Sequence, residues 1–303
     1  ILGRADEAHD WYRKVLAKRP EARGVLQNLV ALAASRKEET RLREYSEKLL
    51  RIDAQSRVAF EGLAGAAFAR GDYNAAVNYC AQLVKVAPDS FAGWYNLGVA
   101  LKYKDDFAGA IDALRRSIAL QPSLHEAHYT LGITLMQQSK LDEAIEAFRG
   151  AVAAKPDFSQ AHYTLGTALQ QKGELDAAIA AFRMAIQLAP LNPETLNTLG
   201  NALRHKGDLP AARVEFAEAA RLNQLKANHQ AATFDTNTGI QKLKQGNLAA
   251  AISLFESAIK KDENYAPAFY QLGLALRKKG DRKGAEAAFA RAQQLDRRLR
   301  PPK

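Results

Sequence analysis

A repeat of 34 residues constrains this sequence more than any other feature. Rows of 34 residues align almost without gaps from Arg57 to Asn192, and the alignment resumes after seven extra residues. Self-similarity at such a period is typical of solenoids, in which each unit buries its apolar face against its neighbours. The rows begin at Arg57, Phe91, His125, Ser159 and Pro193, and then at Ala232 and Ala266.

Each row is expected to form two helices with a short polar break between them. Apolar residues recur three and four positions apart in both halves, as in Ile179, Phe182 and Ile186, which is the pattern of one helix face. Proline ends the second half of several rows, because it lacks an N–H and clashes with the preceding turn. The break is marked by Gly71, Gly173, Gly207, Gly246 and Gly280, and the closing prolines are Pro88, Pro122, Pro156 and Pro190.

Small residues recur where the two helices of a row should meet. A glycine in the first half and an alanine in the second are expected to pack together, which lets the two helix axes approach closely. A phenylalanine is expected to fill the next layer. The glycines are Gly98, Gly132, Gly166, Gly200, Gly239 and Gly273, the alanines Ala110, Ala144, Ala178, Ala212, Ala251 and Ala285, and the aromatics Phe148, Phe182, Phe216, Phe255 and Phe289.

The period, the paired small residues and the closing proline together resemble the tetratricopeptide repeat family, over nearly the whole chain. This resemblance implies an all-α, right-handed solenoid of stacked antiparallel helix pairs with a concave inner groove. About eight 34-residue repeats plus a leading half repeat are expected. The resemblance also implies a role in protein–protein recognition.

The repeats predict six segments. Residues 1–22 form the second half of a truncated repeat, 23–56 a degenerate repeat, 57–224 five regular units, 225–231 an insertion or helix extension, 232–299 two further units, and 300–303 a tail. Because Ile1 falls inside a repeat, we interpret the chain as a fragment or processed product whose targeting signal lies outside it.

Two departures from the repeat carry their own expectations. Val30 stands where the small glycine belongs, and the centre of that row is strongly charged, so a looser or longer hairpin is expected there. Gln224 replaces a closing proline, so the helix that begins near Leu209 can continue past Leu225. The insertion is then either a tolerated change of length or a contact with a partner or a second copy.

If the first helices line a groove, register selects a mixed strip of tyrosine, amide, hydroxyl and apolar side chains. Tyrosine offers area with one polar tip, and asparagine can both donate to and accept from a peptide backbone. The alternative is that these tyrosines only cover the helices. The predicted partner-binding residues are Tyr95, Asn96, Val99, Lys102, Tyr129, Thr130, Ile133, Tyr163, Thr164, Asn197, Asn201, Arg204, Asn237, Tyr270 and Arg277.

Two specialisations of the family can be compared by residue type. Chaperone-tail clamps place lysine where this chain has Tyr95, Tyr129 and Tyr163, so that activity is not supported. The asparagine ladder of the O-linked N-acetylglucosamine transferase superhelix is only partial here, because threonines interrupt it. The partner is therefore expected to be a protein or peptide of unknown identity, or a multi-subunit complex.

No catalytic, cofactor or metal motif stands out, and the chain is not expected to be an enzyme. His128 and His162 are one repeat apart, but neighbouring helices are about 8–10 Å apart, too far for a shared ion. They occupy the packing position that Trp94 fills one repeat earlier. Cys80 stands where other rows have phenylalanine, which favours a buried structural thiol.

Charge adds a competing hypothesis for the last quarter of the chain. The net charge is +10, and residues 225–303 carry 15 basic and 7 acidic side chains. Such a surface could bind an acidic protein, anionic lipid or RNA, although solvated charge is the simpler interpretation and the pattern disfavours nucleic acid. The other alternative to a groove-binding scaffold is a structural subunit that packs against its neighbours through its ends, near residues 1–20 and 282–303.

No run in the sequence approaches the roughly 20 apolar residues of a membrane span.

Overall fold

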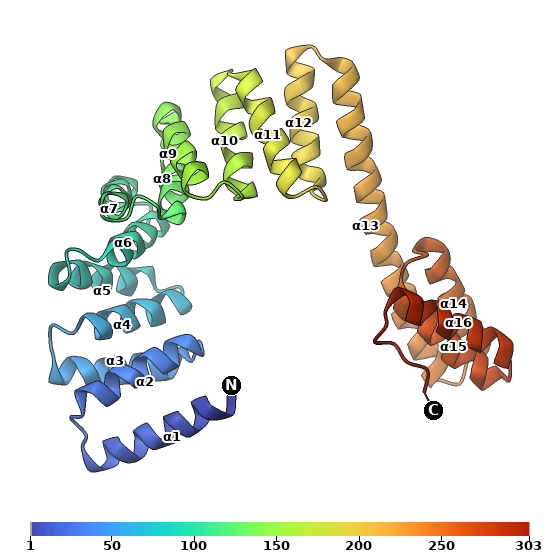
Figure 1. Ribbon diagram of the computed structural model, residues 1–303, viewed down its shortest axis with the longest axis horizontal. Helices are drawn as coiled ribbons and strands as arrows, with labels where there is room; N and C mark the ends of the chain where they lie inside the picture. Colours follow the sequence, from blue (N-terminus) through green and yellow to red (C-terminus); the bar gives the residue numbers. More distant parts are fainter. Residues whose placement is uncertain (1, 303) are drawn as a thin grey trace. The chain divides into compact units, whose positions relative to one another are not determined.

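The computed structural model describes residues 2–302, and every regular element within them is an α-helix (Figure 1). The chain divides into two compact units, residues 1–189 and 190–303. The prediction of an all-α solenoid of paired helices is confirmed. Unit 1 contains α1 (Leu2–Lys18), α2 (Arg23–Ser35), α3 (Glu39–Ile52), α4 (Arg57–Ala69), α5 (Tyr73–Val86), α6 (Phe91–Tyr103), α7 (Phe107–Leu120), α8 (His125–Gln137), α9 (Leu141–Ala154), α10 (Ser159–Lys172) and α11 (Leu175–Leu188).

In unit 1, α1 packs on α2, and five hairpins follow in chain order, from α2/α3 to α10/α11. Each second helix also contacts the first helix of the next hairpin, so neighbouring hairpins share their apolar seams. One such seam combines Ala64 and Cys80 of one hairpin with Leu97 and Ala113 of the next. Stability therefore depends on stacking, as expected for a repeat protein.

The helix ends follow ordinary capping chemistry. Ser56 and Ser90 accept hydrogen bonds from backbone N–H groups at the start of α4 and α6, and Asp72 and Asp106 do the same for α5 and α7. The turn inside each hairpin uses one residue with positive φ, which glycine adopts without strain. These residues are Gly71, Gly173, Gly207, Gly246 and Gly280, and in three hairpins Lys37, Asp105 and Ser139.

The glycine of each first helix packs differently from our expectation. A Cβ added to Gly132 would lie 2.5 Å from the Phe148 ring and would meet that ring before Ala144. The large side chain of the second helix is therefore the nearest contact of the glycine, and at Gly98, where this side chain is Leu114, the Ala110 carbonyl also lies 3.2 Å from the added Cβ. The aromatic ring of the same hairpin fills the space above the glycine, and Gly166, Gly200, Gly239 and Gly273 repeat the arrangement.

The hairpin of residues 23–56 is not longer than the following one, so that part of the expectation is wrong. Its helices have 13 and 14 residues, as in the following hairpin, and Leu26, Leu29 and Leu49 are fully buried. The reason lies in a compensating pair. Val30 replaces the glycine, but the small Ser46 replaces the phenylalanine opposite it, so the interior does not become overfilled.

Unit 2 contains α12 (Pro193–Lys206), α13 (Leu209–Lys244), α14 (Leu248–Lys261), α15 (Ala266–Lys279) and α16 (Arg282–Leu295). Helix α13 has 36 residues and passes without a break through residues 225–231. Its first part pairs with α12 and its last part with α14, so one helix serves two hairpins. The α15/α16 hairpin packs on α14 and on α13. Across residues 2–302, no helix combines the length and apolar character that a membrane span requires.

Candidate functional site

The predicted strip in unit 1 lies on the first helices of three consecutive hairpins, α6, α8 and α10. Two positions of each helix, four residues or about one turn apart, contribute side chains that are all half-buried. Each therefore packs on the hairpin with one side and faces solvent with the other. We call this surface the first-helix face; it consists of Tyr95, Val99, Tyr129, Ile133, Tyr163 and Thr167.

Two of the three tyrosines of the first-helix face, Tyr129 and Tyr163, pack on aromatic rings of the core. The Tyr129 ring centroid lies 5.9 Å from that of Phe148 and 5.1 Å from that of Phe158. The Tyr163 ring lies 5.9 Å from Phe182 in the same way. Aromatic contacts of this kind limit ring rotation, so a partner meets side chains that are already ordered.

The Tyr129 hydroxyl also links two neighbouring first helices. It hydrogen-bonds to Gln160 and Thr164 of α10. Burial raises the pKa of Tyr129, and these hydrogen bonds partly oppose the rise. Tyr129 is therefore a neutral side chain at physiological pH, with its ring fixed between two hairpins.

Two predicted residues beside this face, Thr164 and Lys102, make contacts within the chain itself. Thr164 is buried, and its hydroxyl donates to the carbonyl oxygens of Gln160 at 3.0 Å and Ala161 at 3.2 Å. Lys102 Nζ lies 5.4 Å from the centre of the Tyr103 ring, where a cation–π contact holds it. Asn96 and Thr130 are half-buried beside the tyrosines.

The remaining predicted residues belong to unit 2. On α12, Asn201 Oδ1 accepts a hydrogen bond of 3.0 Å from Arg204, whose guanidinium lies 5.9 Å from the Phe216 ring centre. Asn197 on the same helix is half-buried, and Asn237 on α13 is exposed. The predicted partner-binding residues are thus divided into two sets, one on unit 1 and one on unit 2.

On α15, the ring of Tyr270 lies 5.6 Å from that of Phe289, and Arg277 stacks over the same phenylalanine at 6.0 Å. Arg277 also donates a hydrogen bond of 2.9 Å from Nη1 to the carbonyl oxygen of Pro302. The last predicted groove position is therefore in contact with the tail of the chain.

The sequence analysis missed a pocket between α2, α3 and α4. Two glycines of α4, Gly62 and Gly65, stand at first-helix positions that carry larger side chains in the next hairpins. The apolar side chains of Val30, Leu42 and Val58 line this pocket, and Val30 and Leu42 are themselves largely buried. The signal was present in the sequence as two glycines three residues apart at lining positions.

The two histidines have a structural role in the hairpin seam. Nε2 of His128 donates to the carbonyl oxygen of Pro122 at 2.9 Å, and Nε2 of His162 does the same to Pro156 at 2.9 Å. The indole N–H of Trp94 makes the equivalent 2.9 Å bond one repeat earlier, to the carbonyl of Pro88. In these three consecutive repeats a ring N–H therefore makes the same bond to the carbonyl of the preceding closing proline.

The thiol of Cys80 is fully buried in the seam, and burial raises its pKa to about 12. It is therefore protonated at neutral pH and poorly nucleophilic. Within residues 2–302, no group of three or more His, Cys, Asp or Glu side chains is placed to hold a metal ion.

Unit 2 contains an ion pair whose carboxylate is buried and whose lysine is exposed. Asp235 on α13 is 7% exposed and accepts hydrogen bonds from Ser257 Oγ at 2.7 Å and from Lys261 Nζ at 2.6 Å, both on α14. Burial alone would raise the pKa of Asp235, but the two hydrogen bonds and the charge of Lys261 together lower it below its ordinary value. The pair therefore ties α13 to α14.

Comparison with known proteins gives a family and a fold. A tetratricopeptide repeat model matches residues 62–125, 100–157, 129–193, 163–229 and 237–299. A search of curated proteins finds no match in sequence.

Solved structures match the fold. A crystal structure of MamA is 25% identical, with a TM-score of 0.53, over 55% of this chain and 96% of MamA. MamA residues 41 to the end from Desulfovibrio magneticus RS-1 are 23% identical, with a TM-score of 0.52, over 55% and 94%. YrrB, described as a TPR protein with an unusual peptide-binding site, is 22% identical, with a TM-score of 0.54, over 65% and 97%.

Proposed function

Because the chain belongs to the tetratricopeptide repeat family, whose members are generally non-catalytic protein-interaction scaffolds, we propose that it binds a peptide segment of a protein partner along the first-helix face of unit 1. The observation that carries this proposal is the series of half-buried tyrosines fixed on the aromatic core, with Val99 and Ile133 one turn further along their helices.

Physical chemistry supports this choice of surface. A partly exposed aromatic ring that is already ordered loses little conformational entropy on binding, and such residues are enriched at the energetic centres of interfaces. The apolar side chains beside the tyrosines add area that a partner can remove from water. We also propose that the chain has no catalytic activity of its own.

The first test is affinity capture with the intact chain, followed by a comparison of variants. Truncating the tyrosines would be a poor test, since their rings pack on Phe148 and Phe182 and their loss would disturb the fold. We therefore choose Val99→Glu with Ile133→Glu, which places two charges on the first-helix face. Loss of the captured partner is expected, because each carboxylate would lose hydration in the complex.

The matched control is Ala119→Glu with Ala153→Glu, on exposed positions of α7 and α9 in the same two hairpins. It adds the same charge to the second helices and is expected to leave capture unchanged. Circular dichroism melting of both variants shows whether the fold is retained. Equal capture by both variants would remove the first-helix face from consideration.

A second function, as a structural subunit of a larger assembly, is favoured by exposed apolar side chains in unit 2. Phe234 is 71% exposed and Val214 65%, both on α13. In the regular hairpins the position of Phe234 holds a small buried residue such as Ala127 or Ala161, against which the preceding hairpin packs. A native mass with a fixed stoichiometry that Phe234→Ser abolishes would support assembly, whereas a monomer would argue against it.

A further inference from the structure

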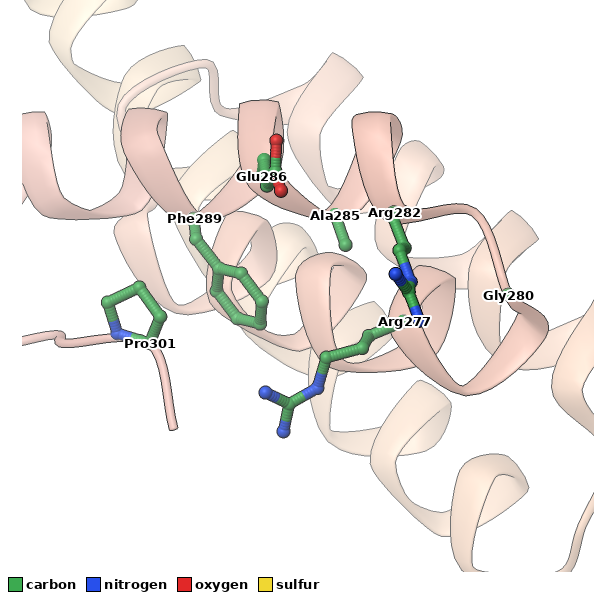
Figure 2. Close-up of a pocket in the computed structure, with 7 residues that line it drawn as sticks. All are labelled: Arg277, Gly280, Arg282, Ala285, Glu286, Phe289 and Pro301. Atoms are coloured by element: carbon green, nitrogen blue, oxygen red, sulfur yellow. The ribbon is translucent and has the colours of Figure 1, made fainter. Parts of the chain in front are cut away.

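We propose that the α15/α16 hairpin carries a second peptide-binding pocket, which the tail of the chain borders, and that an acidic, proline-containing segment of a partner displaces the tail there. This inference rests on the proposed function, because it names a second site and a partner chemistry for the same kind of recognition. The pocket is lined by Arg277, Gly280, Arg282, Ala285, Glu286 and Phe289, with Pro301 of the tail at its edge beside Phe289 (Figure 2).

The tail reaches this pocket by a defined route. Helix α16 ends at Leu295, and the N–H of Leu299 donates to the carbonyl of Asp296 at 3.0 Å, which turns the chain back. The side chain of Arg298 closes the turn on Asp296 at 2.9 Å. Beyond the turn, residues 300–302, which are not helical, lead to α15, where Arg277 binds the carbonyl of Pro302.

A comparison inside unit 2 shows what the tail covers. Arg204 stacks on Phe216 at 5.9 Å, and Arg277 stacks on Phe289 at 6.0 Å, so the two pairs have the same local geometry. Phe216 nevertheless remains partly exposed, whereas Phe289 is only 5% exposed. The difference matches the presence of Pro301 at the second pocket. An extended, proline-bearing segment is therefore a suitable occupant.

The charges indicate that the tail is not the best occupant. The pocket contains Arg277 and Arg282 against a single Glu286, and the tail brings Arg297, Arg298 and Arg300. Arg277 binds the tail through a neutral carbonyl oxygen, although a guanidinium bonds a carboxylate more strongly and in a bidentate manner. A segment with a carboxylate beside its prolines would replace a like-charged occupant with an oppositely charged one.

The experiment uses the full chain and a labelled probe, the peptide Asp-Asp-Leu-Asp-Pro-Pro-Asp, which follows residues 297–303 with each basic residue changed to aspartate. Binding is measured by fluorescence anisotropy. In the variant Pro301→Gly with Pro302→Gly, the tail should leave the pocket, and the apparent affinity for the probe should rise about threefold to tenfold, because a competing closed state is removed.

Arg277→Gln should weaken probe binding about tenfold or more in both backgrounds, since the charged hydrogen bond is lost. Arg204→Gln is the matched control, because it alters the same kind of arginine–phenylalanine pair without a tail, and it should leave probe binding unchanged. The unlabelled basic peptide of residues 297–303 should compete poorly.

An unchanged affinity in the glycine variant, or equal effects of Arg277→Gln and Arg204→Gln, would overturn the inference. These results are independent of partner capture by the first-helix face. If the probe fails to bind but Val99→Glu with Ile133→Glu abolishes capture, only the second pocket is refuted. If the probe binds as expected and capture is insensitive to those changes, the proposed function in unit 1 is refuted instead.

Discussion

Ser46 shows how one residue can decide the packing of a hairpin. It occupies the position that Cys80, Leu114, Phe148 and Phe182 fill in later repeats, and the residue opposite becomes smaller as this side chain becomes larger. Val30 and the Ser46 hydroxyl both lie next to Gly62 of the following hairpin, whereas the Phe148 ring lies against Gly132 of its own hairpin. The serine hydroxyl is fully buried and has no hydrogen-bond partner, so this exchange of volume leaves a polar group unsatisfied.

We expect Ser46→Ala to raise the free energy of unfolding by about 1 kcal/mol, because it removes a buried hydroxyl that makes no hydrogen bond. Ser117→Ala is the control, since the buried Ser117 hydroxyl donates to the carbonyl of Phe91 at 2.9 Å. That variant should lower the free energy of unfolding by about 1 kcal/mol. Denaturation in urea measures both. A loss of similar size in the two variants would show that Ser46 has a partner.

At the scale of elements, the glycine of a first helix and the large side chain of the second form one packing unit. The prediction from sequence placed alanine opposite the glycine, because both lie on inward faces at the same spacing. The ring of Phe148 lies against the glycine instead, because a helix position without a Cβ leaves a depression that a flat ring can fill. Side-chain direction, which residue spacing alone does not specify, decides this contact.

Gly132→Ala tests this pairing. In the wild-type background it should lower the free energy of unfolding by about 1–3 kcal/mol, because the new Cβ meets the Phe148 ring. In a Phe148→Cys background the same change should be neutral or stabilise by up to about 1 kcal/mol, because alanine favours the helix. The pair then repeats Ala64 with Cys80. A double-mutant cycle measured by urea denaturation gives the coupling, and additive effects would contradict the proposed contact.

The pairing of α13 with α14 should depend on pH through Asp235. Its pKa is lowered in the folded protein, so the charged form stabilises the fold. That contribution is complete above the ordinary carboxyl pKa and is lost as pH falls through the lower folded value. We expect Asp235→Asn to cost about 1–2 kcal/mol of unfolding free energy at pH 7, and progressively less in acid. Denaturation of both proteins across this range measures the difference. A cost that stays constant into acid would contradict the ion pair.

At the scale of the whole molecule, the chain has two compact units, each with its own apolar clusters. In unit 1 the side chains of neighbouring hairpins complete the apolar core of each hairpin. A destabilising substitution in one hairpin should therefore destabilise the adjacent hairpins too, with an effect that decreases with distance. In unit 2 the continuous helix α13 joins two hairpins, so their stabilities should be linked more strongly.

Native-state hydrogen exchange can test this division. Phe148→Ala, which removes a fully buried ring, should cost about 3 kcal/mol and speed amide exchange in α8–α11 while leaving α14–α16 protected. Phe255→Ala is the mirrored control in unit 2 and should speed exchange in α13–α16. Mass spectrometry of peptic fragments resolves the helices. Faster exchange throughout the chain in either variant would show that the two units unfold together.

The amino-acid sequence by itself determined the repeat, the helix pairs, the glycine turns and the family, because these follow from spacing along one chain. Helix periodicity, proline and positive φ are local properties, so Gly71 or Pro122 could be interpreted without knowing their neighbours. Only the tertiary structure decided which side chain fills the space above Gly132, how Ser46 compensates Val30, and that Arg277 binds the tail. Those contacts join residues from different helices, and they depend on side-chain direction and volume in three dimensions.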